Sequence, residues 1–96
     1  SCELPTADAW PGGFVLNNIR VTNEGAEPIT DWQATLTFDQ NVSVVNGWSG
    51  EFTQQANQVT VTPVDHNRQL APGQTTMFGF QGSLSGSTLS VSCSVE

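Results

Sequence analysis

The residues of this sequence best suited to bind a ligand are its three tryptophans, because an indole has the largest apolar face of any side chain. Trp10 in "AWPGGF" and Trp48 in "NGWSG" are flanked by turn-forming residues and lack apolar neighbours at two-residue steps. Trp32 is the second residue of "DWQATLTF", in which every second residue from Trp32 onward is apolar. This pattern predicts that Trp32 is buried and that Trp10 and Trp48 are displayed for a partner. The alternative for these two is that each covers an open end of a small core.

No constellation of catalytic residues accompanies the tryptophans. The single histidine, His66, directly follows Asp65, and neighbouring side chains of an extended segment point to opposite sides, which argues against a catalytic triad. The sequence has no metal-ligand spacing around His66, no glycine-rich phosphate loop and no paired carboxylates among aromatic residues. Asp39 with Asn41, or Asp65 with Asn67, is too short a match to predict a calcium site. We therefore expect neither catalytic residues, nor a metal, nor a cofactor.

The net charge of the chain argues against several classes of binding partner. Arg20 and Arg68 are the only basic residues apart from the histidine, against nine acidic ones, for a net charge of −7. Such a surface argues against nucleic acid, anionic membranes and strongly acidic polysaccharides, and it is compatible with a neutral partner. No apolar run approaches the ~20 residues of a membrane span.

Apolar residues recur with a period of two, which is typical of strands that bury one face. The pattern is found in "NNIRVTN", "DWQATLTF", "NQVTVTP", "TTMFGFQG" and "STLSVSCSVE", and clusters of Gly, Pro, Asn and Asp separate these runs. About seven to nine short strands at this spacing predict an all-β fold, an antiparallel β-sandwich of jelly-roll or immunoglobulin-like type. Without a linker or an internal repeat, residues 1–96 are expected to form a single domain.

The apolar residues between Phe14 and Val21 do not keep a single alternation. Phe14 and Leu16 share one parity, whereas Ile19 and Val21 have the other. A β-bulge at residues 17–18 would keep all four side chains on the core side.

Two cysteines lie near the two ends of the chain. An even pair in a small extracellular domain predicts a Cys2–Cys93 disulfide that joins the termini, with two free buried thiols as the alternative. Adjacent termini suit a module within a longer secreted polypeptide. The lack of a signal peptide and of an initial methionine suggests that this sequence was taken from such a polypeptide.

The tryptophan contexts, the terminal cysteines and "APGQTTMFGFQGSLSG" together resemble the bacterial family 2 carbohydrate-binding modules, of the type that binds cellulose or chitin. The resemblance covers essentially the whole chain. It implies a β-sandwich attached to a secreted cellulase, xylanase or chitinase, with a planar row of exposed aromatic residues that stacks on sugar rings. Trp10 and Trp48 match two positions of that row, and Trp32 matches the buried tryptophan of the family.

The resemblance also implies roles for several amides, which in the family bond to sugar hydroxyls beside the aromatic row. They correspond to Asn17 or Asn18, to Asn46 and to Gln81. A further glutamine position of the family is occupied here by Met77.

The third aromatic position of the row is expected in the loop after "VTVTP". Counting along this loop without a gap places His66 where cellulose-binding members have a tryptophan. The alternative is that the loop turns His66 away and offers Asp65, Asn67 or Arg68 to the ligand.

The residue three positions beyond the first tryptophan separates two groups of the family. Xylan-binding members have an arginine there that props the indole upright, whereas this chain has Gly13. Without a side chain beneath it, the indole of Trp10 is free to lie flat. A flat ring favours cellulose or chitin over xylan.

Together these features predict a non-catalytic polysaccharide-binding module, monomeric, secreted and covalently linked to a catalytic domain that it anchors to insoluble cellulose or chitin. The alternative is a protein–protein or adhesion β-sandwich in which Trp10 and Trp48 anchor an interface.

Overall fold

The computed structural model describes residues 1–5 and 7–95, and in this part of the chain the regular structure is almost entirely β. Its one helical turn is the 3₁₀ helix η1, Asp65–Asn67. The strands are β1 Cys2–Glu3, β2 Asp8–Trp10, β3 Gly13–Thr22, β4 Ile29–Thr30, β5 Ala34–Phe38, β6 Val42–Trp48, β7 Glu51–Gln55, β8 Gln58–Thr62, β9 Gln69–Leu70, β10 Thr75–Leu84 and β11 Val91–Val95. No helix within the described ranges is long and apolar enough to cross a bilayer.

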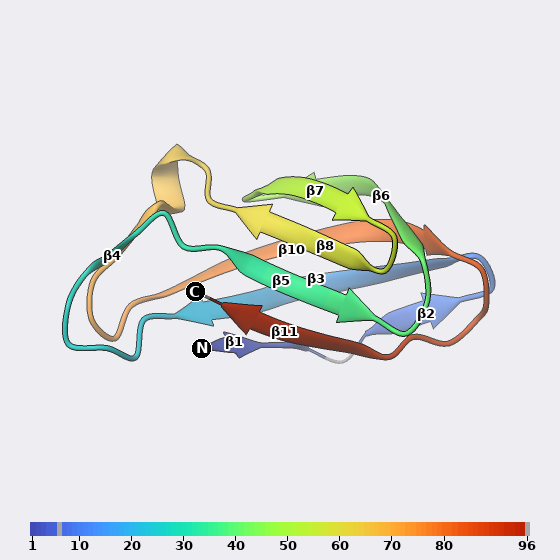
Figure 1. Ribbon diagram of the computed structural model, residues 1–96, viewed down its shortest axis with the longest axis horizontal. Helices are drawn as coiled ribbons and strands as arrows, with labels where there is room; N and C mark the ends of the chain where they lie inside the picture. Colours follow the sequence, from blue (N-terminus) through green and yellow to red (C-terminus); the bar gives the residue numbers. More distant parts are fainter. Residues whose placement is uncertain (6, 96) are drawn as a thin grey trace.

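The strands form a sandwich of two antiparallel sheets (Figure 1). The five-stranded sheet has the order β1-β3-β10-β6, and β2 also pairs with β3. The four-stranded sheet has the order β11-β5-β8-β7, and the short strands β4 and β9 form a separate ladder. The prediction of an all-β antiparallel sandwich is confirmed.

Alternating side chains from both sheets fill one core. Trp32, which is fully buried, stacks on Phe78 with the ring centroids 5.7 Å apart. Its indole N–H donates to the carbonyl oxygen of Asn67 at 2.8 Å, so the one polar atom of the ring is satisfied. The predicted burial of Trp32 is confirmed. The other buried apolar residues are Phe14, Leu16, Ile19, Val21, Ala34, Leu36, Phe38, Val42, Val59, Val61, Leu70, Phe78, Phe80 and Leu84.

The predicted bulge in β3 is also present. Ile19 pairs with Phe78 and Leu16 pairs with Phe80, so residues 17–18 together face the single residue Gly79 of β10. The backbone of Asn18 has φ +58°, a left-handed conformation that asparagine tolerates better than most residues. The bulge leaves both asparagines exposed while the flanking apolar residues stay in the core.

The cysteines form the predicted disulfide. Cys2 of β1 is bonded to Cys93 of β11, across a sequence separation of 91 residues. Because β1 belongs to the five-stranded sheet and β11 to the four-stranded sheet, the bond joins the two layers near the chain ends.

The two exposed tryptophans lie at strand ends, directly before the turns that flank them. Trp48 is the last residue of β6 and Trp10 the last of β2, so both tryptophans lie on strands and the turns are confined to residues 49–50 and 11–12. The structure also has more strands than predicted. Strands β1, β4 and β9 have two residues each, too few for a pattern, and β7 is almost wholly polar and exposed.

Candidate functional site

Trp10 projects from a tight hairpin between β2 and β3. Residues 11–12 make the turn, and Gly12 has φ +86°, as expected for the third residue of a type II turn that begins with Trp10 and Pro11. Trp10 pairs with Gly13 across the hairpin. A Cβ on Gly13 would lie 2.5 Å from Nε1 of Trp10, so the indole packs onto the bare backbone of this glycine. The side chain stays 41% exposed.

Trp48 repeats this arrangement at another place on the sheet. It pairs with Gly79 of β10, and a Cβ on Gly79 would lie 2.6 Å from Cζ2 of the indole. The neighbours of Gly79 in sequence, Phe78 and Phe80, point into the core, so Gly79 and the ring that covers it lie on the outer surface. Trp48 is 38% exposed.

The two tryptophans lie on the same outer surface with amide side chains between them. Gly13 lies beneath Trp10 and pairs with Ser83 of β10. Gly79 lies beneath Trp48 and is four residues from Ser83 on the same strand. The two glycines that carry the indoles are therefore separated by about 13 Å along the strand direction. Gln81 lies midway and pairs directly with Asn46 of β6; both are exposed. We call the surface made by Trp10, Trp48, Asn46 and Gln81 the aromatic face.

The bulge asparagines border the aromatic face. Both residues lie opposite Gly79 and therefore next to the strand position that Trp48 covers. Asn18 also lines a hollow of about 210 Å³ together with Trp48, Ser49, Met77 and Phe78. Met77, two residues from Gly79 on β10, is 47% exposed.

His66 is exposed on η1, and this turn is fixed to the end of β6 by the buried Asn67. The Asn67 amide donates to the carbonyl oxygen of Ser49 at 2.8 Å, and its Oδ1 accepts the backbone N–H of Val64 at 2.9 Å. Ser49 directly follows Trp48, so η1 lies beside the Trp48 end of the aromatic face. Asn67 is an internal anchor, and the alternative in which it is offered to a ligand is wrong for this residue.

Arg68 holds the other side of this turn. Its guanidinium donates to Asp31, which precedes Trp32, and at 3.2 Å to Asp65. These contacts raise the pKa of Arg68. The hydrogen bond to Asp31 is the largest cause, and the hydrogen bond to Asp65 is the second. All three side chains are substantially exposed, so the pairs orient the loop more than they stabilise the fold.

The full sequence, residues 1–96, matches the family described as cellulose binding domain. The chain belongs to this family. The chain is 38% identical to exoglucanase B of Cellulomonas fimi over 87 residues. This match covers 90% of the chain and 8% of that protein. The chain spans less than a quarter of the length of this relative and of endoglucanase A of Thermobispora bispora.

Two solved domains also resemble this cellulose binding domain over its whole length. The cellulose-binding family 2 domain of ScLPMO10C is 29% identical, with a TM-score of 0.67 and 91% of that chain covered. The chitin-binding domain of Chi18aC from Streptomyces coelicolor is 26% identical, with a TM-score of 0.69 and 87% of that chain covered.

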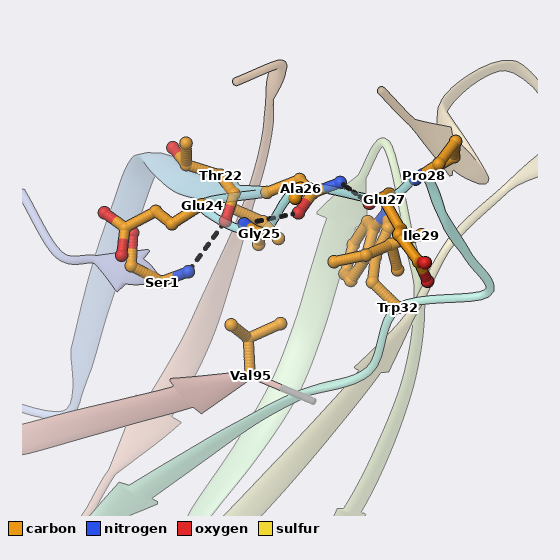
Figure 2. A pocket seen from close by; sticks show the side chains of 12 residues that line it. Ser1, Thr22, Glu24, Gly25, Ala26, Glu27, Pro28, Ile29, Trp32 and Val95 are labelled. Atoms are coloured by element: carbon orange, nitrogen blue, oxygen red, sulfur yellow. Dashed lines mark hydrogen bonds between the residues drawn. The ribbon is translucent and has the colours of Figure 1, made fainter. Parts of the chain in front are cut away.

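A larger hollow of the cellulose binding domain, about 530 Å³, lies away from the aromatic face. Figure 2 shows that Val95 of β11 points into it and that the N-terminal amine of Ser1, bonded to Thr22, lies at its rim. The loop at residues 23–28 and Ile29 of β4 form another wall of this hollow, and Trp32 lines it from the core. None of the residues predicted to bind a ligand lines this hollow.

Sequence reasoning missed two residues that build the site. Gly79 provides the open backbone on which Trp48 rests, and the only signal was a glycine interrupting the apolar alternation of "MFGF". Asn67 was considered only as a ligand-binding residue, because nothing local in the sequence shows that its amide reaches Ser49, 18 positions earlier.

Proposed function

We propose that this cellulose binding domain is a non-catalytic module that adsorbs to insoluble cellulose or chitin through the aromatic face. The observation that carries the proposal is the placement of two exposed indoles over glycines on one sheet surface, with paired amides between them. A β-linked polymer presents C–H bonds on its ring faces and hydroxyl groups at its edges. Indoles suit the ring faces, and the amides of Asn46 and Gln81 suit the hydroxyl groups.

The exposed areas indicate modest affinity. Trp10 is 41% and Trp48 38% exposed, so each has about 60–100 Å² left to bury, worth roughly 1.5–2.5 kcal/mol before the costs of association. Those costs offset a large part of the gain, and we expect micromolar rather than nanomolar binding to a single surface site. The net charge of −7 is no obstacle, because both polymers are nearly neutral.

In the full-length protein the module would hold a tethered enzyme at the polymer surface and raise its effective concentration there. This role is supported by relatives in which the matching segment is a small part of a glucanase. A secreted, extracellular location and a monomeric module follow from the same proposal.

Depletion of the purified domain by microcrystalline cellulose and by chitin tests the proposal. We expect loss from solution on at least one polymer, no loss on insoluble xylan, and loss of adsorption in the Trp10→Ala, Trp48→Ala double variant. Failure to adsorb to either polymer would overturn the proposal. Concentration-dependent self-association without polysaccharide binding would favour the protein–protein alternative, and turnover of any glycan would contradict a non-catalytic module.

A further inference from the structure

We propose that Gln40, in the turn between β5 and β6, positions the indole of Trp10 for polymer binding without itself belonging to the aromatic face. This inference rests on the proposed function and adds to it a residue that acts through a neighbouring loop. The loop consists of residues 85–88, between β10 and β11, and we call it the β10–β11 loop. Hydrogen bonds connect Gln40 to this loop and the loop to the turn that carries Trp10.

The strand that carries Trp10 has little packing to fix its position. All three residues of β2 are exposed, and β2 pairs with β3 at the edge of the five-stranded sheet. Two backbone hydrogen bonds hold the turn at residues 11–12 from outside the hairpin. The N–H of Gly12 donates to the carbonyl oxygen of Gly86 at 3.0 Å, and the carbonyl oxygen of Gly12 accepts the N–H of Leu84 at 3.2 Å. The direction in which this turn presents Trp10 therefore depends in part on where Gly86 lies.

The β10–β11 loop, which Figure 1 shows passing beside the β2–β3 turn, is itself held by one side chain. Residues 85–88 are all exposed, so burial does not fix them. Oε1 of Gln40 accepts the backbone N–H of Ser85 at 3.2 Å and that of Gly86 at 3.3 Å, and it also accepts the Ser85 hydroxyl at 3.2 Å. Nε2 of Gln40 donates to the carbonyl oxygen of Thr88 at 2.8 Å. A single amide thus orients both sides of the loop, and with them the Gly86 carbonyl that holds the turn.

The neighbour of Gln40 in sequence holds a different part of the same connection. The backbone N–H of Asp39 donates to the carbonyl oxygen of Ser90 at 3.1 Å, and Oδ1 of Asp39 accepts the N–H of Ser90 at 3.3 Å. Ser90 directly precedes β11, so these two bonds fix the start of that strand and not the Gly86 carbonyl. Gln40 is therefore the residue that connects the β5–β6 turn to Trp10.

The test replaces Gln40 by methionine, which nearly matches glutamine in length but lacks the amide. Without the amide the loop is free to take other positions, and apparent affinity falls with the fraction of molecules that keep the ring aligned. We expect Gln40→Met to weaken adsorption by about two- to tenfold on whichever solid polymer, cellulose or chitin, the wild-type domain binds. The loss should be no larger than that of Trp10→Ala, because Gln40 acts through this ring.

A double-variant cycle separates positioning of Trp10 from a general loosening of the domain. Gln40→Met should weaken adsorption when Trp10 is present and have no further effect in a Trp10→Ala background. Amide hydrogen exchange provides a readout that is independent of the polymer. Protection of the Gly12 N–H should fall in Gln40→Met, whereas protection of β8, which is paired on both sides, should stay as in the wild type.

Gln74→Met is the matched control, because this glutamine also bridges a turn. Its Oε1 accepts the N–H of Ala71 at 2.9 Å, in the turn before β10 and at the opposite end of that strand from Leu84. Gln74→Met should leave adsorption and the exchange of Gly12 unchanged. Gly86 takes part through its backbone only, so an alanine at this position keeps both of its hydrogen bonds. Thermal unfolding of each variant checks that the fold is intact.

A second variant keeps the test decisive if Gln40→Met does not fold. Gln40→Asn retains the amide but shortens the side chain by one methylene group, so that it no longer bridges Ser85 and Thr88. It should show the same losses of adsorption and of Gly12 protection.

The outcomes distinguish this inference from the proposed function. Wild-type adsorption in the Gln40 variants, an equal loss with and without Trp10, or unchanged exchange of Gly12 would overturn the inference while leaving polysaccharide binding in place. Failure of the wild-type domain to adsorb to either solid polymer would overturn both.

Discussion

The indole of Trp10 rests on Gly13, its partner across the β2–β3 hairpin, so that a Cβ on this glycine would lie 2.5 Å from Nε1. Gly13→Ala should lift the ring from the sheet and tilt it out of alignment with Trp48. Because the ring would keep only part of its contact with a flat polymer, adsorption should weaken by roughly 1 kcal/mol. Adsorption isotherms on chitin and cellulose measure this change.

A second glycine provides the control for that substitution. A Cβ on Gly86 would lie 3.8 Å from the nearest atom, Oε1 of Gln40, which is an ordinary contact. Gly86→Ala should therefore leave adsorption as it is, and both alanine variants should melt close to the wild type. Unchanged adsorption of Gly13→Ala would contradict the view that this glycine sets the orientation of the ring.

Removing either exposed indole should reduce binding without loss of the fold. Trp10→Ala and Trp48→Ala are each expected to weaken adsorption by about 1–3 kcal/mol, since each removes one stacking surface. Both rings cover only the outer surface of a strand, so the free energy of unfolding should change little. Urea unfolding, measured beside the isotherms, provides the comparison.

Trp32→Ala is the contrasting variant. The ring is fully buried, stacks on Phe78 and donates to Asn67, so its removal should cost about 3–5 kcal/mol of stability. If Trp10→Ala destabilised the domain to the same degree, Trp10 would belong to the core and the aromatic face would lose one of its two rings.

The disulfide should contribute more to stability than to binding. Cys2–Cys93 closes a loop of 91 residues, for which the chain-entropy account gives about 4–5 kcal/mol as an upper value. A Cys2→Ser, Cys93→Ser double variant should unfold at much lower urea than the wild type. Its folded fraction should adsorb normally, because neither cysteine belongs to the aromatic face. Equal urea midpoints for the two proteins would show that the sandwich does not depend on this bond.

The core could be predicted from the sequence because burial imposes a period of two on each long strand. The opposite parities of Leu16 and Ile19 even indicated the bulge, since both residues had to face the core. The same reasoning failed for β7, in which Phe52 is the one apolar residue and packs partly buried against Phe80, with the ring centroids 5.4 Å apart. The other residues of β7 are polar and exposed and are held by pairing with β8, and a strand without apolar alternation leaves no period of two in the sequence.

The site was predictable in its residue types and less so in its geometry. Two tryptophans without apolar neighbours indicated a display surface, but their resting places on Gly13 and Gly79 depend on strand register. The position of His66 was harder to predict from the sequence than that of the tryptophans. It depends on two long-range hydrogen bonds of Asn67, one that its amide donates to Ser49 and one that its backbone carbonyl oxygen accepts from Trp32, and on the ion pairs of Arg68.

His66 is predicted to extend the aromatic face beyond Trp48. His66→Trp should tighten adsorption to crystalline polymer by about 1 kcal/mol, because an indole has more face than an imidazole. Arg68→Ala should weaken adsorption only through loss of the loop's position, so the gain from His66→Trp should shrink when both changes are combined. Isotherms of the two single variants and the double variant, compared as a cycle, measure this dependence.

The pH dependence of binding provides an independent check on the same loop. The folded-state pKa of Arg68 is raised, so its contribution is complete at and below neutral pH and is lost only in strongly alkaline solution. The ion pairs of Arg68 therefore add no pH dependence to adsorption between about pH 5 and 8. Stacking of His66 on a neutral polymer should give nearly constant adsorption across this range. A loss of adsorption toward pH 5 that His66→Trp abolishes would contradict a contact made by stacking alone and would identify His66 as the source of the pH dependence. Unchanged adsorption in His66→Trp at every pH, with weakened adsorption in Arg68→Ala, would transfer the contact from His66 to Arg68.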